Sequence, residues 1–461
     1  MDPAPPFDLN QLRRDWIVGV RGSAFFRRVE RRIAAIRKQG MAAHTRGVLI
    51  VEPDPLKFAA AFFAAVHERM PVILANPRWG RLEWTETADQ LNPAVLFGPC
   101  PLDGAKRKKR VPRVAPSTIL IPTGGTSGGV RFAIHRWETL EAACEGLTRF
   151  IGPGPVDSCC VLPLFHVSGL MQLMRSFTTG GRIAFCRCED LQAGRFPKMQ
   201  KGSLCLSLVP TQLQRLIGSR RALRRLLLAR AIFLGGSPAP EALLARAREL
   251  RLPLFPSYGM TETAAMVAAL PPDEFLSGSS AAGRPLGHVK IDILSEGGKP
   301  CGVGTNGRIR IKGRSIFKGY HGRGRTSPET GHLTDDEGFI DPHGRLHVIG
   351  RRDRLVISGG EKIDPQEVEQ AILETGAVEQ ALVLGWPDPE WGRKLVAFYV
   401  TAGVESDPRR WESELRAELA HYKVPKLMIQ VKMLPLDARG KVDRRLMERL
   451  IRKALDTQAA S

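Results

Sequence analysis

Short apolar runs that alternate with amphipathic segments constrain the fold of this chain more than any other feature of its sequence. Helical spacing of apolar residues predicts helices over Phe25–Lys38 and Pro55–Arg69. The β-branched run Gly47–Glu52 between them predicts a buried strand. The same alternation continues through the first half of the chain. Strands and helices that alternate in this way favour a helix-flanked, mostly parallel sheet, so we predict an α/β fold.

Small or polar turns follow several of the expected strands. Gly235-Gly236 follows one of them, Ser257–Thr263 follows the next, and a turn at His166–Gly169 interrupts another apolar run. In open α/β sheets, ligands collect at the carboxyl ends of the strands. The turns therefore predict one shared ligand cleft. Between two of them, apolar spacing over Thr211–Leu228 predicts a single helix.

The segment Thr118–His135 is a glycine-rich loop between two expected strands. Ile119–Ile121 leads into Pro122, and a second strand is expected over Val130–Ile134. Backbone N–H groups and hydroxyls of such a loop are suited to holding phosphate. It is not a Walker A loop, because no Gly-Lys-Ser/Thr precedes a helix. Phosphate binding and a plain surface hairpin both remain open at this point.

Length, charge and cysteine content narrow the class of protein. With 461 residues, the chain is long enough for two or more domains. A net charge of +21 suits nucleic acid, an anionic membrane or polyanionic small molecules. The one dense basic run, Lys106–Arg113, is interpreted as a solvated connector, so we expect no nucleic-acid partner. The longest apolar run, Phe58–Val66, is too short for stable membrane insertion.

The eight cysteines are scattered without metal-ligand spacing, and Cys159-Cys160 and Cys186-x-Cys188 have no matching second pair. Reduced cysteines in the core of a cytoplasmic protein are therefore expected. The N-terminus has no basic region followed by an apolar core, so we expect no secretory signal.

Beyond Gly283 the pattern changes to short strands with Gly and Pro turns, which predicts a small β subdomain that includes a strand at Ile316–Tyr320. His332–Asp341 is expected to place three carboxylates in a turn. Asp364-Pro365-x-Glu367 is a capping box at the start of a helix. Further strands, a helix over Trp411–His421 and a basic C-terminal helix follow. We predict a large domain over residues 1–349 and a small α+β domain over residues 350–461.

Five blocks in a fixed order resemble the adenylate-forming superfamily of acyl- and aryl-CoA synthetases, peptide-synthetase adenylation domains and luciferases. They are the glycine loop, SYGMTET, LTDDEGFID, GRRDRLVISGGEKIDPQEVE and LPLDARGKVDRR. The resemblance implies a large N-terminal domain and a small mobile C-terminal domain. It also implies a two-step reaction, in which a carboxylate attacks Mg-ATP to give acyl-AMP and pyrophosphate, and a thiol such as CoA then displaces AMP.

The resemblance implies an ATP site formed by several blocks. Its ATP- and AMP-binding residues are Thr123, Gly124, Gly125, Thr126, Ser127, Gly128, Arg131, Gly235, Gly236, Ser257, Tyr258, Gly259, Asp336 and Arg351. Arg131 stands where the superfamily usually has lysine. Thr261 would contact the α-phosphate, and Glu262 would bind Mg²⁺ through oxygen.

The same resemblance implies the roles of the second domain. Lys441 would bridge the carboxylate substrate and the α-phosphate in the first step, so it is the expected catalytic lysine with Thr261 and Glu262. Asp353 takes the hinge position. Ser358, Gly359 and Gly360 would line the CoA tunnel. Asp336 would bind both ribose hydroxyls, although Asp335 replaces the usual glycine before it.

Three local blocks are similar to the 2-succinylbenzoate–CoA ligases of menaquinone and phylloquinone biosynthesis. They are PTGGTSGGVRFAIHRWETL, PLFHVSGLMQLMRSF and SYGMTETAAM. The similarity implies a dianionic aryl substrate, whose second carboxylate would be held by His166, Ser168 and Gly169, with Arg175 as a further candidate.

Other substrates and roles remain open in the sequence. They are another aryl- or fatty acyl-CoA ligase, a free-standing enzyme that loads a carrier protein, and a non-catalytic relative. The expected partners are a small carboxylate, ATP and CoA, and a homo-oligomer is also open.

Overall fold

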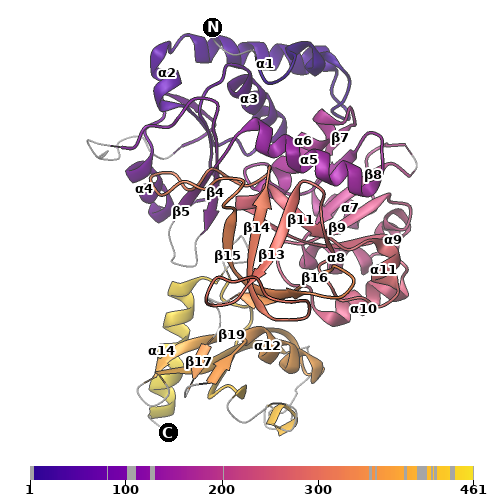
Figure 1. Ribbon diagram of the computed structural model, residues 1–461, viewed down its shortest axis with the longest axis vertical. Helices are drawn as coiled ribbons and strands as arrows, with labels where there is room; N and C mark the ends of the chain where they lie inside the picture. The colour runs from indigo at the N-terminus through magenta and orange to yellow at the C-terminus, as the bar shows by residue number, and fades with distance from the viewer. Residues whose placement is uncertain are drawn as a thin grey trace. The chain divides into compact units, whose positions relative to one another are not determined.

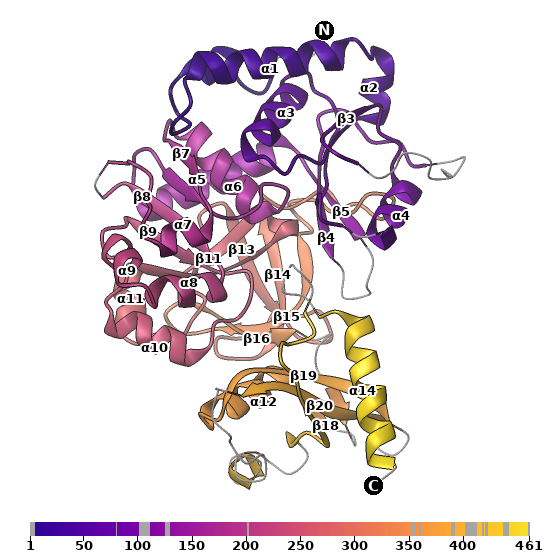
Figure 2. The same cartoon turned by 180° about the vertical axis from the view of Figure 1, so that it is seen from behind.

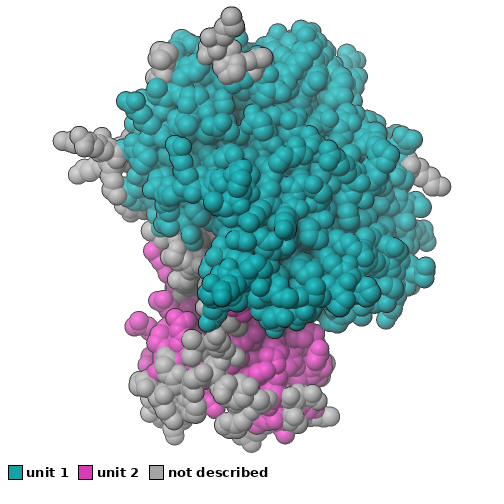
Figure 3. Space-filling model, in the orientation of Figure 1, with its two compact units in different colours: residues 1–334, 338–348 teal, residues 335–337, 349–461 magenta. Residues whose placement is uncertain are grey.

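The computed structural model divides the chain into two compact units, formed by residues 1–334 with 338–348 and by residues 335–337 with 349–461 (Figure 3). The residues described are 5–79, 81–100, 111–124, 130–200, 202–351, 356–358, 361–388, 392–401, 413–416, 419, 423–436 and 442–459.

Within the described residues, the first sheet has the strand order β3-β1-β2-β4-β5. These strands are β3 (Val95–Phe97), β1 (Val48–Ile50), β2 (Val72–Leu74), β4 (Ile119–Gly124) and β5 (Val130–His135). The first four are parallel, and β5 returns antiparallel to β4. Pro122 does not end β4, which continues to Gly124 as the first arm of the glycine-loop hairpin.

Helices cover both faces of this sheet (Figure 1). They are α1 (Gly22–Arg37), the short α2 (Met41–Arg46), α3 (Pro55–His67) and α4 (Arg81–Gln90), after a 3-10 turn at Leu9–Arg13. Asp54 caps α3 by accepting a hydrogen bond from the backbone N–H of Lys57, and Pro55 takes the first helical position. Every residue of the long apolar run Phe58–Val66 is buried in this helix. The run that is too short for a membrane span is therefore a core helix.

The larger sheet has the order β12-β11-β10-β9-β8-β6-β7 in the part of the chain that the structure describes. Its strands are β12 (Arg284–Pro285), β11 (Ala265–Ala269), β10 (Leu254–Met260), β9 (Ala231–Leu234), β8 (Leu204–Leu208), β6 (Asp157–Cys160) and β7 (Ile183–Phe185). The run from β10 to β7 is parallel, whereas β11 and β12 are antiparallel to their neighbours.

One core lies between the two sheets and includes α5 (Trp137–Ile151) and α6 (Val167–Thr178) (Figure 2). A second core covers the other face of the larger sheet. Its helices are α7 (Cys188–Gln192), α8 (Pro210–Ile217), α9 (Arg220–Leu226), α10 (Glu241–Glu249) and α11 (Pro272–Leu276). The prediction of one helix over Thr211–Leu228 was wrong, because the chain breaks at Gly218 and Ser219 caps a new helix through the N–H of Ala222.

The third sheet has the order β13-β14-β15-β16 among the described residues. These strands are β13 (Val289–Leu294), β14 (Gly307–Gly313), β15 (His332–Ile340) and β16 (Leu346–Arg351). Two expectations were wrong here. His332–Asp341 is mostly a strand rather than a turn, and Ile316–Tyr320 forms only isolated bridges, one of them from Tyr320 to Ala133 of β5.

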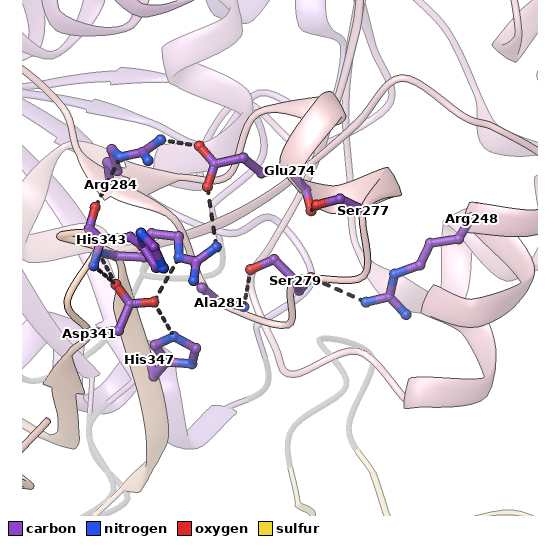
Figure 4. Close-up of polar contacts among 10 residues, drawn as sticks. Arg248, Glu274, Ser277, Ser279, Ala281, Arg284, Asp341, His343 and His347 are labelled. Atoms are coloured by element: carbon purple, nitrogen blue, oxygen red, sulfur yellow. Dashed lines mark hydrogen bonds and ion pairs between the residues drawn. The ribbon is translucent and has the colours of Figure 1, made fainter.

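The turn between β15 and β16 is organised by Asp341 (Figure 4). Its carboxylate accepts hydrogen bonds from the backbone N–H groups of His343 and Arg345, from Arg345 Nε at 2.7 Å, and from His347 at 3.1 Å. Glu274 of α11 forms ion pairs with Arg345 and Arg284. The turn is thereby joined to the larger sheet.

The second unit is an α+β domain. Its elements are β17 (Val356–Ser358), β18 (Glu361–Ile363), α12 (Pro365–Glu374), β19 (Val378–Asp388), β20 (Gly392–Thr401), β21 (Leu427–Gln430) and α14 (Arg444–Ala459). Asp364 caps α12 through the N–H of Gln366, as the capping pattern predicts. Separate cores on the two faces of the β19-β20-β21 sheet include residues of α12 and of α14. Of the helix expected over Trp411–His421, only residues 413–416 and 419 are described.

The predicted fold class, mixed α/β with a large N-terminal part and a small C-terminal part, is confirmed. No helix in the described ranges is both long and apolar enough to cross a membrane.

Candidate active site

The segment Ser257–Thr263 forms the end of β10 and a short 3-10 turn, Thr261–Thr263. The turn is tightly constrained. A Cβ atom on Gly259 would lie 2.0 Å from the carbonyl oxygen of Ala265, so only glycine fits. Ala264 and Ala265 have φ values of 53° and 76°, a region that residues with a Cβ seldom adopt. Backbone strain of this kind persists where the surroundings enforce it, often at functional sites.

Glu262 is buried in this turn and is held by Tyr320. The Tyr320 hydroxyl donates a 2.6 Å hydrogen bond to Glu262 Oε1, and the backbone N–H of Phe317 donates to the Glu262 carbonyl oxygen at 2.9 Å. Glu262 is 7% exposed. The second carboxylate oxygen, Oε2, accepts no hydrogen bond from the described residues. A buried carboxylate with one oxygen left over suits a divalent cation that takes its other ligands from water and phosphate.

His135, the last residue of β5, supports the neighbouring Thr261. Its Nε2 lies 2.7 Å from the Thr261 carbonyl oxygen, and its Nδ1 lies 3.0 Å from the Thr139 hydroxyl. Burial lowers the pKa of His135 to about 4, and the nearby Lys318 acts in the same direction. The ring is therefore neutral at physiological pH and acts as a hydrogen-bonding brace between the two sheets.

Arg131 connects the glycine loop with Glu262 through Tyr320. It lies on β5 directly opposite Thr123 of β4. Its guanidinium carbon lies 5.3 Å from the centre of the Tyr320 ring, and its buried Nε has no hydrogen-bond partner among the described residues. The structure thus brings Thr123, Arg131, Tyr320 and Glu262 together. Gly125, Thr126, Ser127 and Gly128 lie outside the described residues, and Gly124 is the last residue of β4.

Gly235 and Gly236 pass close to Ser257. The Ser257 hydroxyl donates to the Leu234 carbonyl oxygen at 2.9 Å, and a Cβ atom on Gly235 would lie 2.9 Å from that hydroxyl oxygen. Gly236 has a φ of 88°. Tyr258 is half-buried and packs, like Tyr320, against the core that contains β13 and β14. The two strand ends therefore lie side by side at one edge of the parallel sheet.

The turn with His166, Ser168 and Gly169 starts α6, and it follows β6 of the same sheet. His166 is the residue before the helix, and its ring lies 4.6 Å from that of Phe165. Gly169 has a packing role, because a Cβ atom there would lie 2.1 Å from the Pro163 carbonyl oxygen. Since β6, β9 and β10 are parallel members of one sheet, these turns all lie at its carboxyl edge, as predicted.

A polar face runs along α6 from this turn to a buried arginine. Ser168, Gln172 and Arg175 recur at helical spacing, and Gln172 donates to the Ser168 carbonyl oxygen at 3.2 Å. Gln172 is 1% exposed, and its Oε1 has no hydrogen-bond partner among the described residues. Arg175 is 4% exposed, and its Nε likewise has no hydrogen-bond partner among them.

The titratable groups that act on Arg175 are thiols. They belong to Cys144, Cys205 and Cys160, and burial raises their pKa values to about 12, 11 and 12. They are therefore neutral at physiological pH. Burial also lowers the pKa of Arg175, but a guanidinium keeps its proton in proteins. Arg175 is thus a buried positive charge without an anionic partner in the described structure.

In the second unit, several predicted residues are described and several are not. Asp336 is buried on β15, and the neighbouring Asp335 is exposed. Successive strand residues point to opposite faces, so the unusual Asp335 does not share the face of Asp336. Ser358, at the end of β17, is buried, and Arg351 ends β16. Lys441, Asp353, Gly359 and Gly360 lie outside the described residues.

Comparison with known proteins decides the family. Residues 101–321 match the AMP-binding enzyme family, and residues 367–441 match the AMP-binding enzyme C-terminal domain. The chain belongs to the AMP-binding enzyme family.

Curated relatives of this AMP-binding enzyme carry a more specific name. A 2-succinylbenzoate–CoA ligase of Geobacillus kaustophilus is 34% identical over 74% of this chain and 70% of its own length. The ligase of the same name from Bacillus velezensis is 36% identical over 72% of this chain and 69% of its own length. A solved structure of the o-succinylbenzoate CoA synthetase of Bacillus subtilis, with the acyl-adenylate intermediate bound, has 25% identity and a TM-score of 0.78. The match covers 95% of this chain and 96% of that one.

Neither Tyr320 nor His135 is predicted from the sequence as a site residue of the AMP-binding enzyme. Tyr320 ends the strand expected over Ile316–Tyr320, and His135 ends the glycine-loop segment Thr118–His135. Nothing in the local pattern says that their side chains reach Glu262 and Thr261. That proximity arises because the segment around Tyr320 bridges to β5 and Phe317 hydrogen-bonds to the Glu262 turn.

Proposed function

We propose that this protein is an ATP-dependent 2-succinylbenzoate–CoA ligase of the menaquinone or phylloquinone pathway. It adenylates the substrate carboxylate with release of pyrophosphate and then transfers the acyl group to CoA, as an AMP-forming acid–thiol ligase. ATP, Mg²⁺ and CoA are its co-substrates and cofactor. Two curated relatives with this name and a solved acyl-adenylate complex of a similar enzyme support the assignment.

For the first half-reaction, the phosphate end of ATP would lie against the glycine loop. Backbone N–H groups and hydroxyls of residues 123–128 would bind the β- and γ-phosphates, and Arg131, whose buried Nε has no hydrogen-bond partner among the described residues, would donate to the same phosphates. Glu262 would hold Mg²⁺ through its remaining oxygen, and the bound ion would neutralise phosphate charge. The geometry of Glu262 fits this role because Tyr320 fixes one oxygen and leaves the other.

The nucleoside end would lie between the glycines of β9 and the aromatic residue of β10. Gly235 and Gly236 would form one wall of the adenine pocket, and Tyr258 would stack on the base. The Ser257 hydroxyl keeps these two strand ends close through its hydrogen bond to the Leu234 carbonyl oxygen, and Gly259 lets the chain pass close to Ala265 of β11. Asp336 would accept hydrogen bonds from the ribose hydroxyls, with Arg351 beside it. Lys441 would act on the carboxylate and the α-phosphate, with Thr261 as a further contact.

For the second half-reaction, the small domain would rotate about Asp353. This rotation would move Lys441 away from the reacting groups and bring the face with Ser358, Gly359 and Gly360 to them. This face would line the path of the CoA thiol. Domain alternation of this kind gates the two chemical steps. The domain boundary near residue 349 and these roles are part of the proposal.

The observation that carries the choice of substrate is the unpaired charge of Arg175. Arg175 lies 5.8 Å from the centre of the Phe233 ring but has no anionic partner among the described residues. A buried cation of this kind is costly, and a carboxylate that forms a bidentate pair with it removes that cost. A monocarboxylate presents its single carboxylate to ATP and leaves Arg175 unpaired. A dicarboxylate such as 2-succinylbenzoate has a second carboxylate, which would pair with Arg175. His166, Ser168 and the free Oε1 of Gln172 would contact the rest of the acyl group.

The test is ATP–pyrophosphate exchange with a panel of acids, followed by mass detection of CoA thioesters. The panel holds 2-succinylbenzoate, benzoate, a cinnamate and short- and medium-chain fatty acids. We expect exchange and thioester with 2-succinylbenzoate alone. Exchange with another acid would replace the substrate, and exchange without a CoA product would favour the carrier-protein alternative. No exchange with any acid would contradict the enzymatic assignment.

The role of Arg175 is tested by its replacement with Met, which keeps the volume of the side chain stem but removes the charge. We expect kcat/KM for 2-succinylbenzoate to fall about 100-fold, since a charge-assisted bidentate pair is worth roughly 2–3 kcal/mol. The two single-carboxylate analogues, 4-oxo-4-phenylbutanoate and 2-butanoylbenzoate, serve as controls. Whichever of them is adenylated should be affected several-fold less. Equal losses on the dianion and on that monoanion would contradict the assignment.

Location in the cytoplasm and assembly into a homo-oligomer remain predictions from the sequence. The substrates of the protein are small molecules.

A further inference from the structure

Two cysteines that are far apart in the sequence touch in the fold. The Sγ atoms of Cys159 and Cys186 are 3.2 Å apart, although 27 positions separate the residues. Cys159 lies on β6, and Cys186 follows the last residue of β7, the neighbouring parallel strand. The backbone N–H of Cys186 donates to the Cys160 carbonyl oxygen at 2.9 Å, which holds the two chain segments together.

The two thiols differ in exposure. Cys159 is fully buried in the core on the α7–α10 side of the larger sheet, whereas Cys186 is partly exposed at the margin of that core. Cys160, the next residue on β6, packs in the other core, on the side of α6. The pair therefore lies on the opposite face of the sheet from Arg175.

The sulfur atoms are close, but a disulfide bond requires the backbone at Cys186 to shift, because Cys186 lies two residues beyond Ala184, the residue that pairs with Cys159. An S–S bond is about 2.05 Å long, so the sulfur atoms must approach by about 1.2 Å. β7 is the edge strand of its sheet, and Cys186 lies beyond its last paired residue. On its outer side β7 forms an isolated bridge with Ile17 at Ile183, three residues before Cys186, so a small shift of Cys186 can leave that bridge intact.

The contact also differentiates the reactivity of the two thiols. The Cys159 thiol donates a hydrogen bond to the Cys186 sulfur. This bond lowers the pKa of Cys186 below its ordinary value, and the same bond together with burial raises the pKa of Cys159. A partly exposed thiol with a lowered pKa is the one that attacks disulfides.

We propose that Cys159 and Cys186 form a dithiol modification site that reacts with small-molecule disulfides. The Cys186 thiolate attacks one sulfur of R–S–S–R and displaces RS⁻, which leaves a mixed disulfide on Cys186. The Cys159 thiol then loses its proton and attacks the Cys186 sulfur, which releases a second RS⁻. Two protein thiols are oxidised to one disulfide, one R–S–S–R is reduced to two RSH, and the two thiol protons complete the products.

The cross-link would fasten the edge strand β7 to β6. Closing a loop between residues 159 and 186 restricts the unfolded chain, so the oxidised protein should be more stable than the reduced one. The bond would form on the opposite face of the sheet from α6, but at the carboxyl ends of β6 and β7, so ligase activity before and after oxidation shows whether the cross-link affects the turn that follows β6. The site is independent of the proposed substrate.

The experiment treats the full-length reduced protein with 2-hydroxyethyl disulfide, followed by alkylation and peptide mapping by mass spectrometry. In the wild type we expect one cross-linked peptide pair, Cys159 with Cys186, a mass lower by two hydrogens and no retained adduct. Cys159→Ala should instead retain the mercaptoethanol adduct on Cys186. Cys186→Ser should leave Cys159 unmodified. Cys301→Ser is the matched control, since Cys301 is also partly exposed but its sulfur lies 3.8 Å from the Asn306 carbonyl oxygen and not against another thiol of the described residues.

Thermal unfolding of the same samples gives a second measurement. The melting temperature of the wild type should rise by a few degrees on oxidation and that of Cys186→Ser should not. A stable adduct on Cys186 of the wild type, a cross-link between other cysteines, or no reaction at Cys186 would overturn the proposal. If Cys159→Ala fails to fold, the wild type, Cys186→Ser and Cys301→Ser still decide between these outcomes.

Discussion

At the scale of single residues, the site depends on side chains that hold the ligating groups in place. Tyr320 is the clearest case, because its hydroxyl fixes Glu262. Tyr320→Phe keeps the ring and removes the donor. The apparent affinity for Mg²⁺ in the adenylation step should therefore fall about 10- to 100-fold, the usual effect of losing a group that orients a metal ligand. The measurement is ATP–pyrophosphate exchange as a function of Mg²⁺ concentration. Tyr399→Phe, in the second unit, is the control, and an unchanged Mg²⁺ dependence in Tyr320→Phe would contradict the role.

Two buried histidines should make stability fall at moderately acidic pH. Burial lowers the pKa of His135 and of His288 to about 4. Between pH 6.5 and 4 the unfolded chain binds protons that the folded protein excludes, so the free energy of unfolding falls as the pH falls through this window. The full shift of each group corresponds to roughly 3 kcal/mol.

His288 allows this prediction to be tested away from the site. Neither of its ring nitrogens has a partner in the described structure, and a Cβ atom on Gly146 would lie 1.8 Å from its Nδ1. The ring thus packs directly against Gly146, and Phe keeps a flat aromatic ring at this position while removing the titratable nitrogens. His288→Phe should unfold at a higher urea concentration than the wild type at pH 5, with a smaller difference at pH 7.5. An equal difference at both pH values would refute the titration of His288.

At the scale of elements, the β15–β16 turn should contribute stability through Asp341. Burial alone would raise the pKa of Asp341, but hydrogen bonds from Arg345 and His347 hold it well below its ordinary value. This contribution is present above the unfolded pKa of about 4 and is lost as the pH falls below it. Asp341→Asn should cost about 1–3 kcal/mol at pH 7. Urea unfolding at pH 7 and pH 3 measures it, and a cost that persists undiminished at pH 3 would contradict the ionic explanation.

The elements also mark the limit of local patterns. Capping residues made the start of α12 predictable, because Asp364 and Pro365 act on their immediate neighbours. The break at Gly218 and the strand at His332–Ile340 were not predicted. In the first case a glycine between apolar residues of helical spacing leaves both outcomes open. In the second, acidic residues favour a turn locally, and pairing in a sheet with β14 and β16 overrides that preference.

At the scale of the whole molecule, the proposed reaction assigns its two steps to different placements of the small domain. Lys441→Ala should abolish formation of the acyl-adenylate but leave thioester formation from supplied acyl-AMP largely intact. ATP–pyrophosphate exchange measures the first step, and mass detection of the CoA thioester measures the second. An equal loss in both would show that Lys441 serves more than adenylation. Lys453→Ala, on α14, is the control for loss of a basic residue in the same unit.

The sequence by itself determined the family, the alternation of strands and helices, and the turns at the carboxyl ends of the strands, because these features are local or lie in contiguous blocks. Only the tertiary structure decided which side chains meet. Tyr320 reaches Glu262 from 58 positions away, and His135 reaches Thr261 from 126. Arg175 became informative only when its burial was known, together with the lack of an anionic partner in the part of the chain that the structure describes. Cys159 and Cys186, separate in the sequence, touch because two parallel strands lie side by side. Such contacts depend on long-range packing, which no local pattern records.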